Sequence, residues 1–291
     1  MASTARQAFE EFEAKLALTN SQRATVSSRR STTDSYLQRS FGADTTLPLL
    51  STQVIGSAHR DTIIRPLDDL DVLAVFSNEH GLFDGAYRWD SQKFLYRVRQ
   101  ALSEFRIETV GSRGQAVRLF YKVPPNVDVV PAVGLQTGGY HIPSGNGGWV
   151  TTNPARHASW MIERNAALGY HLKPLVRLLK RWNGVHSNRM QSFHLEVVTA
   201  TAFGSMNSNR REASLRFFEW APNYLYVGDP AGHSGDLSSY LTWTARQQLV
   251  QSLQSSAQRA ALAVDAENRG DHAEAIRQWR IIYGPDFPSS E

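Results

Sequence analysis

The spacing of apolar positions predicts that the first half of the chain mixes helices and strands. Phe9 and Phe12 recur at a helical interval, and Thr19 with Gln22 has the spacing of a capping box that begins a second helix. Residues 91–105 place their apolar side chains on one face, which predicts a further amphipathic helix. Short apolar runs between polar turns predict strands near 53–55, 70–76 and 127–133, and two strands within 107–122.

The second half of the chain has helical spacing almost throughout. A Gly/Pro-rich stretch at 136–149 precedes it and is predicted to be a loop or the edge of a hinge. The predicted helices are 155–168, 171–183, 192–203, about 238–267 and 271–284. We therefore predict two domains, residues 1–153 and 154–291, with a cleft between them.

Composition narrows the classes of protein without naming a function. Of the 291 residues, 41% are hydrophobic and 20% charged, which is typical of a globular chain. No apolar stretch approaches the ~20 residues that span a bilayer, and the first residues lack a signal-peptide core, so no membrane association is expected. The absence of cysteine excludes disulfides and thiolate zinc sites and fits a cytoplasmic protein. The net charge of +4 suits an anionic ligand, but it does not by itself indicate nucleic-acid binding.

Three aspartates lie directly before an apolar strand, in the sequence LDDLDVLAVF. Side chains alternate along a strand, so Asp69 and Asp71 share one face about 7 Å apart, while Asp68 points to the other and is interpreted as a turn or cap residue. Asp128 is similarly unexpected within the valine-rich run 127–133. If a neighbouring strand brings Asp128 beside the pair, the three carboxylates can hold two metal ions. Oxygen ligands without His or Cys favour Mg²⁺, with Mn²⁺ as a substitute.

A Gly-Ser pair precedes the acidic strand. Gly56 and Ser57 give a turn whose backbone N–H groups and hydroxyl can cradle phosphates at a helix start. The same dipeptide also occurs at 111–112 and 204–205, so it is uninformative alone. Only at 56–57 is it followed, twelve residues after the serine, by Asp-x-Asp entering a strand. This combination, together with the later aspartate in a valine run, predicts metal-dependent nucleotidyl transfer.

The stretch GSAHRDTIIRPLDDLDVLAVF resembles the signature of the DNA polymerase β-type nucleotidyltransferases. It more closely resembles the CD-NTases, the bacterial relatives of cyclic GMP-AMP synthase and the oligoadenylate synthases. HLKPLVRLLKRWN, SFHLE and AENRGDHAEAIRQWRIIYGPDF support the narrower family, so the resemblance runs from about residue 55 to 287. The sequence HRD after Gly-Ser-Ala departs from the commoner Arg-Gly-Thr pattern.

The resemblance implies an α+β fold, with a polymerase β-like core, an all-α lobe like that of oligoadenylate synthase, and the active site in the cleft between them. It implies that Asp69, Asp71 and Asp128 are the catalytic metal ligands. It also implies that Gly56, Ser57, Lys180 and Ser192 hold the triphosphate. Phe193, next to Ser192, either stacks on a base or packs in the core.

The basic helix allows two interpretations. Lys173, Arg177, Lys180 and Arg181 lie on one side of HLKPLVRLLKRWN, and such a stripe is more often a solvated face than a ligand site. All four charges are positive, however, without acidic partners at the i,i+4 spacing, which suits a triphosphate.

The family further implies that ribonucleoside triphosphates are joined into a cyclic di- or trinucleotide. This product would signal to a cyclic-nucleotide-sensing effector in antiphage defence, with a regulatory partner protein possible and nucleic acid not required.

Three alternatives remain open from the residues. The chain could be a nucleotidyltransferase that does not cyclise, making a linear oligonucleotide or modifying a small molecule. The second half lacks the acidic character that polycationic antibiotics favour. It could also be a catalytically silent nucleic-acid-binding module, although a binder gains nothing from three repelling carboxylates. In an unrelated α/β scaffold the aspartates would be only a turn, and Asp69→Asn would leave function unchanged.

Overall fold

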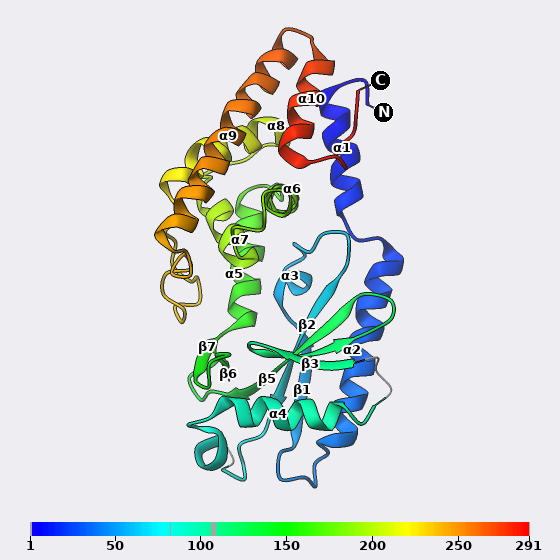
Figure 1. The fold of residues 1–291 in the computed structure, drawn as a ribbon, viewed down its shortest axis with the longest axis vertical. Coiled ribbons are helices and arrows are strands. Elements are labelled where there is room, and N and C mark those ends of the chain that lie inside the picture. Colours follow the sequence, from blue (N-terminus) through cyan, green and yellow to red (C-terminus); the bar gives the residue numbers. More distant parts are fainter. Residues whose placement is uncertain (1, 82, 106–108, 291) are drawn as a thin grey trace. The chain divides into compact units, whose positions relative to one another are not determined.

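A computed structural model describes residues 2–81, 83–105 and 109–290, and the chain divides into two compact units (Figure 1). The sheet unit comprises Leu18–Arg60 and Pro66–Ala158. The helical unit comprises Met1–Ala17, Asp61–Arg65 and Ser159–Glu291.

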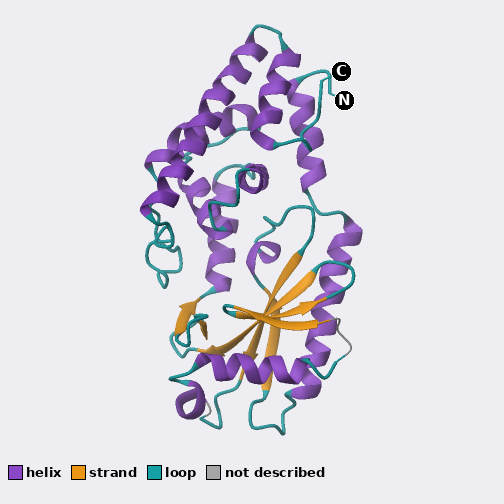
Figure 2. Ribbon diagram, viewed as in Figure 1, coloured by secondary structure: helices purple, strands orange, loops and turns teal. Residues whose placement is uncertain are grey.

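The sheet unit is built on one seven-stranded mixed sheet (Figure 2). Its strands are β1 (Leu49–Val54), β2 (Asp69–Phe76), β3 (Thr109–Arg113), β4 (Ala116–Phe120), β5 (Asn126–Gly134), β6 (Tyr140–Pro143) and β7 (Trp149–Thr152). The order along the sheet is β1-β2-β5-β4-β3, with β6 joining β5 and β7 joining β6. Among the strand pairs of the described residues, β2 with β5 alone is parallel, so the same ends of these two strands lie together.

Alternation along the strands gives the sheet two different faces. One face of β2 carries Leu70, Val72, Ala74 and Phe76, which pack with α2 (Asn20–Ser40) and α4 (Ser91–Leu102) in one core cluster. The other face carries Leu73 and Val75 of β2 with Val130 and Ala132 of β5 in a smaller cluster. Asp69, Asp71 and Asp128 belong by alternation to this second face.

The stretch predicted to be a loop at 136–149 in fact contains strand structure. β6 and the first residue of β7 lie in it, and the two strands pair as an antiparallel hairpin. The prediction was wrong because glycine and proline dominate the composition, whereas Tyr140 and Ile142 are half-buried and buried against the second face. Residues 107 and 108 of the predicted strand pair at 107–122 lie outside the described residues.

The helical unit contains α1 (Ala5–Leu16), α6 (Leu172–Val185), α7 (Ser192–Thr201), α8 (Arg210–Trp220), α9 (Trp243–Asn268) and α10 (His272–Tyr283). The helix α5 (Pro154–Ala167) begins in the sheet unit and continues into the helical unit. Helix α8 was not predicted, and α9 begins several residues after the predicted start near 238. The helical unit also has the 3₁₀ turn η2 (Ala221–Asn223), whereas the four-residue α3 (Gly56–His59) and the π-helical turn η1 (Phe83–Tyr87) belong to the sheet unit.

The first helix packs with the last one rather than with its neighbours in sequence. The ring of Phe9 meets Trp279 edge-on at 5.0 Å and Phe287 at 5.2 Å, and Phe12 lies 5.8 Å from Tyr283. This aromatic cluster places α1 in the helical unit, whereas the predicted boundary assigned residues 1–153 to one domain.

Among the described residues, no helix combines the length and the apolar character needed to cross a bilayer.

Candidate active site

The sheet register brings two of the predicted aspartates into one row. In the parallel pair β2–β5, Asp71 lies opposite Asp128, and Asp69 lies opposite Asn126. Residues directly opposite each other in a sheet point to the same side, and so do residues two apart on one strand. Asp69, Asp71 and Asp128 therefore share one face of the sheet, as the sequence predicted if β5 adjoined β2.

An arginine that the sequence reasoning missed completes this row. Arg118 of β4 lies opposite Asp128 in the antiparallel β4–β5 pair. Its Nε donates to Asp128 Oδ1 at 2.7 Å and its Nη2 to Oδ2 at 2.6 Å, and Nη2 also lies 3.0 Å from Asp69 Oδ2. The signal was present, because Arg118 interrupts the apolar run AVRLF in the way that Asp128 interrupts its valines. We call these four side chains, Asp69, Asp71, Arg118 and Asp128, the carboxylate row.

Asp71 has a raised pKa. Burial is the largest cause, the negative charges of Asp128 and Asp69 add to it, the positive charges of Arg60 and Arg118 oppose it, and the net result is a pKa of about 6. A cation bound nearby would stabilise the ionised form of such a carboxyl group. The row therefore has the electrostatic character expected of a cation site.

Gly56 forms the wall beside Asp71. The residue has φ +65°, and a Cβ built on it would lie 2.1 Å from Asp71 Oδ2. The adjoining backbone is fixed, since the N–H of Ile55 donates to the carbonyl of Asp71 at 3.0 Å. Ser57 follows in the first turn of α3, half-buried. The predicted phosphate turn therefore lies directly beside Asp71, one of the three predicted metal ligands, within the sheet unit.

The donor atoms of the row fit a divalent metal of the Mg²⁺ type. They are carboxylate oxygens from one face of adjacent strands, and Mg²⁺ prefers such hard ligands. Within the described ranges no group of three or more His, Cys, Asp or Glu is arranged as a metal cage. Instead Arg118 neutralises Asp69 and Asp128.

The raised pKa of Asp71 makes metal binding pH-dependent. The pKa of this carboxyl group is about 6, so it is mostly protonated at lower pH, and a proton on a ligand opposes metal binding. We expect Mn²⁺ to bind about tenfold more weakly at pH 5 than at pH 7 in the absence of nucleotide. Isothermal titration at the two pH values measures this, and Asp71→Asn should flatten the difference. Equal affinity at both pH values in the wild type would contradict the expectation.

Lys180, in the helical unit, is held by a buried network. Its Nζ lies 2.6 Å from Glu196 Oε1 and donates to Thr62 Oγ1 at 3.2 Å, and Thr62 Oγ1 donates to Glu196 Oε1 at 2.8 Å. Glu196 is fully buried and Lys180 nearly so, which makes the pair costly to break. Lys180 therefore does not lie on a solvated face of the helix.

Two more cations of the basic helix also have acidic partners, supplied by distant segments. Arg177 donates to the Asp61 carbonyl at 2.9 Å and lies 3.8 Å from its carboxylate, and Arg181 donates to Asp286 at 2.5 Å. The i,i+4 rule found no partners because these come from other parts of the fold.

Ser192 and Phe193 begin α7. Ser192 is exposed in the first turn, and the preceding Gln191 makes no side-chain cap, so this helix N-terminus suits an anion. Phe193 is partly buried against the helical core, and its exposed part leaves the stacking role a prediction. The interpretation of His194 as a packing residue is confirmed, since it is buried and bonds to Tyr240 and to the Leu225 carbonyl.

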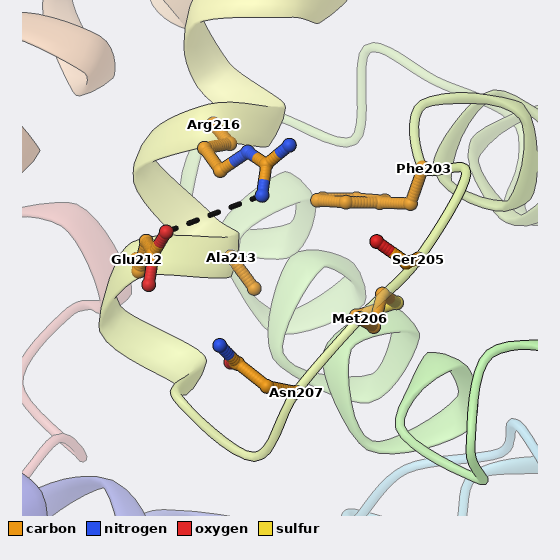
Figure 3. A pocket seen from close by; sticks show the side chains of 7 residues that line it. All are labelled: Phe203, Ser205, Met206, Asn207, Glu212, Ala213 and Arg216. Carbon is orange, nitrogen blue, oxygen red and sulfur yellow. Dashed lines mark ion pairs between the residues drawn. The ribbon is translucent and has the colours of Figure 1, made fainter.

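Two cavities formed by described residues are not lined by any of the predicted site residues. One, of about 140 Å³ in the helical unit, is lined by residues that include Phe203, Asn207 and Arg216 (Figure 3). The guanidinium carbon of Arg216 is 5.9 Å from the centroid of the Phe203 ring. The volume of this cavity is below the ~300 Å³ of a typical ligand pocket. Another, of about 500 Å³, adjoins Phe83, His141 and Trp149 in the sheet unit, beyond the carboxyl end of β5. Asp69 lies at the opposite, amino end of β2.

Comparison with known proteins identifies relatives along most of the chain. Residues 3–165 match the family described as the Second Messenger Oligonucleotide or Dinucleotide Synthetase domain. A probable cyclic nucleotide synthase of Bacillus cereus (strain VD146) is 27% identical over 273 residues, covering 81% of this chain and 82% of the relative. A cyclic AMP-AMP-AMP synthase of Acinetobacter sp. (strain ATCC 27244 / 9458) is 29% identical over 259 residues, covering 81% and 72%.

Solved structures confirm the predicted fold class. The Vibrio cholerae DncV cyclic AMP-GMP synthase with the linear intermediate pppA(3′,5′)pG has a TM-score of 0.78 at 14% identity, covering 96% of this chain and 94% of that one. The CdnC:HORMA-deltaN complex of E. coli MS115-1 gives 0.74 at 20% identity, covering 97% and 98%. At this identity the likeness shows the fold alone, and it is the mixed-sheet fold with helices that the sequence predicted.

Proposed function

Because the chain belongs to the Second Messenger Oligonucleotide or Dinucleotide Synthetase family, we propose that it joins ribonucleoside triphosphates into a cyclic di- or trinucleotide and releases pyrophosphate. The carboxylate row carries this proposal, since it combines three acids on one face with a turn able to hold phosphates. Relatives named as cyclic nucleotide synthases along four-fifths of the chain support the cyclic product over a linear one.

Each transfer makes and breaks one phosphorus–oxygen bond. The acceptor hydroxyl oxygen attacks the α-phosphorus of a nucleoside triphosphate, the bond to pyrophosphate breaks, and the hydroxyl proton passes to a base. We assign Asp128 as the base that accepts this proton, because its carboxylate lies opposite Asp71 in the carboxylate row. In the last transfer, the free hydroxyl of the terminal nucleotide attacks the α-phosphorus of the first nucleotide's triphosphate, pyrophosphate leaves and the ring closes.

The remaining side chains bind the donor. We propose that Asp69, Asp71 and Asp128 hold two Mg²⁺ ions, which when bound would supply Lewis-acid activation and charge neutralisation at the α-phosphate. Gly56 and Ser57 would hold the triphosphate through their N–H groups and hydroxyl.

In the helical unit, Lys180 and Ser192 would contact the β- and γ-phosphates. Lys180 then shares its charge with Glu196, so a phosphate oxygen would join, rather than replace, an existing ion pair. Phe193 would stack on a base.

Product analysis tests the proposal. The wild type is incubated with all four labelled ribonucleoside triphosphates and Mg²⁺ or Mn²⁺, and phosphatase-treated products are resolved by chromatography and mass spectrometry. We expect a phosphatase-resistant product without free ends. Products with free ends, from which the phosphatase removes terminal phosphates, would support the non-cyclising alternative. Steeply salt-dependent duplex binding without turnover would instead support a silent nucleic-acid-binding module.

A signalling role follows as a further part of the proposal. We propose that the product activates a cyclic-nucleotide-sensing effector in antiphage defence. A HORMA partner is present in the E. coli CdnC complex, and we propose that a regulatory protein controls this enzyme too. Adding candidate partners to the product assay, and measuring the initial rate, tests that control.

A further inference from the structure

Arg118 occupies the oxygens that the metal ions would need. Its guanidinium takes both oxygens of Asp128 in a two-pronged contact and one oxygen of Asp69. Its side chain is only 13% exposed, so water screens these contacts weakly. Arginine stays positively charged at any pH at which the protein folds. The row is therefore neutralised in part before any metal arrives.

A guanidinium and a dication compete at such a site. Both require carboxylate lone pairs, and two cations at contact distance repel each other strongly where the surroundings are partly buried. Asp71 differs from its neighbours because, within the described part of the chain, Arg118 pairs with Asp69 and Asp128 and not with Asp71. The pKa of Asp71 also responds less to Arg118 than to Arg60. A first ion can approach Asp71, but full use of Asp69 and Asp128 requires Arg118 to give up contacts.

We propose that Arg118 is an exchangeable counter-cation of the carboxylate row. In the metal-free protein it holds Asp69 and Asp128 in place and limits their repulsion. When metal binds, the contact with Asp69 breaks first, because it is the longer one and involves a single oxygen pair. Because the metal must displace contacts of Arg118, the affinity of the row for metal without nucleotide is lowered. Metal therefore binds together with the triphosphate. The inference rests on the proposed function and assigns a regulation to the same site.

Electron paramagnetic resonance measures the binding of Mn²⁺ without nucleotide. It distinguishes this role of Arg118 from a role in which Arg118 only orients Asp128. Competition predicts that Arg118→Gln binds Mn²⁺ about tenfold more tightly than the wild type without nucleotide. Orientation alone predicts weaker binding, because the carboxylates lose the group that holds them. A non-hydrolysable ATP analogue should narrow the difference. Unchanged or weaker Mn²⁺ binding by Arg118→Gln would overturn the proposal.

Thermal unfolding gives a second, independent readout. Without metal, Arg118→Gln should melt at a lower temperature than the wild type, because three carboxylates then repel with less compensation. Saturating Mg²⁺ should raise the melting temperature of the variant more than that of the wild type. Equal melting temperatures without metal would also overturn the proposal. Arg99→Gln, which removes the same charge from an exposed position on α4, corrects for net charge.

Arg118→Lys keeps the inference testable if the glutamine variant does not fold. Lysine retains the charge but not the two-pronged geometry, so its Mn²⁺ affinity should lie between those of the wild type and the glutamine variant. An affinity no tighter than wild type would overturn the proposal. The wild-type product assay runs in parallel: product together with unchanged Mn²⁺ affinity in both variants rejects this inference alone. If the wild type neither formed product nor bound Mn²⁺, the result would count against the proposed function.

Discussion

Replacing Asp69 and Asp71 together by asparagine should lower product formation on the order of 10⁴-fold while the protein stays folded. Both side chains lie on the face of β2 that carries the carboxylate row. Asparagine keeps their size but removes the charge that holds a divalent ion, and metal stabilisation of the transition state is worth several kcal/mol. Each 1.36 kcal/mol is a factor of about ten in rate.

Stability should respond in the opposite direction. In the metal-free protein the pKa of Asp71 is raised to about 6, so its ionised form is disfavoured by the fold at neutral pH. The double variant should therefore unfold at a temperature no lower than the metal-free wild type. Initial rates and thermal unfolding, measured on the same preparations at pH 7, check both expectations.

Asp68→Asn is the matched control. Asp68 is exposed and precedes the strand, and its backbone carbonyl, which accepts from the N–H of Asn126 at 2.8 Å, is kept in the variant. Its activity should stay within a few-fold of wild type. Activity retained by the double variant, or lost equally in Asp68→Asn, would favour the alternative in which the aspartates form only a turn.

Gly56→Ala should reduce product formation about 10³-fold. The added Cβ would lie 2.1 Å from Asp71 Oδ2, which no real contact allows, so either the turn or the carboxylate must move. Positive φ adds about 1 to 2 kcal/mol of strain for a residue with a Cβ. A displacement of about 1 Å at reacting groups costs on the order of 10²-fold, and here both the metal ligand and the phosphate turn are affected.

Gly114→Ala separates the strain from the collision. Gly114 has φ +59°, close to that of Gly56, but a Cβ there would meet no atom within 4 Å. Gly56→Ala should lose at least as much stability as Gly114→Ala by thermal unfolding, because it adds the collision to the strain, and only Gly56→Ala should lose activity and Mn²⁺ binding. A Gly56→Ala enzyme as active as Gly114→Ala would show that Asp71 has no strict position in the reaction.

The acidic part of the site was predictable because it depends on local rules. Alternation along a strand places Asp69 and Asp71 on one face whatever the rest of the fold does, and a lone acid among valines marks Asp128 as exceptional. Only the adjacency of β2 and β5 had to be supplied from outside the residues. The structure has that pairing, in a register that sets Asp71 opposite Asp128.

The partners of the basic residues were not predictable, since they depend on contacts between distant segments. Nothing near Lys180 in the sequence points to Glu196 on another helix, or to Thr62 more than a hundred residues earlier. Arg118 is a different case, because the reasoning that singled out Asp128 applied equally to it. The hairpin β6–β7 was missed because composition outweighed the two apolar side chains that anchor it.

The position of α1 has a consequence for folding during synthesis on the ribosome. A ribosome adds residues at about 5 to 20 per second, so Phe9 and Phe12 emerge well before Trp279, Tyr283 and Phe287, against which they pack. Until these later residues are synthesised, the two rings lack their native neighbours. A nascent chain stalled before α10 would therefore display an aromatic amino-terminal helix, the kind of exposed surface that chaperones bind.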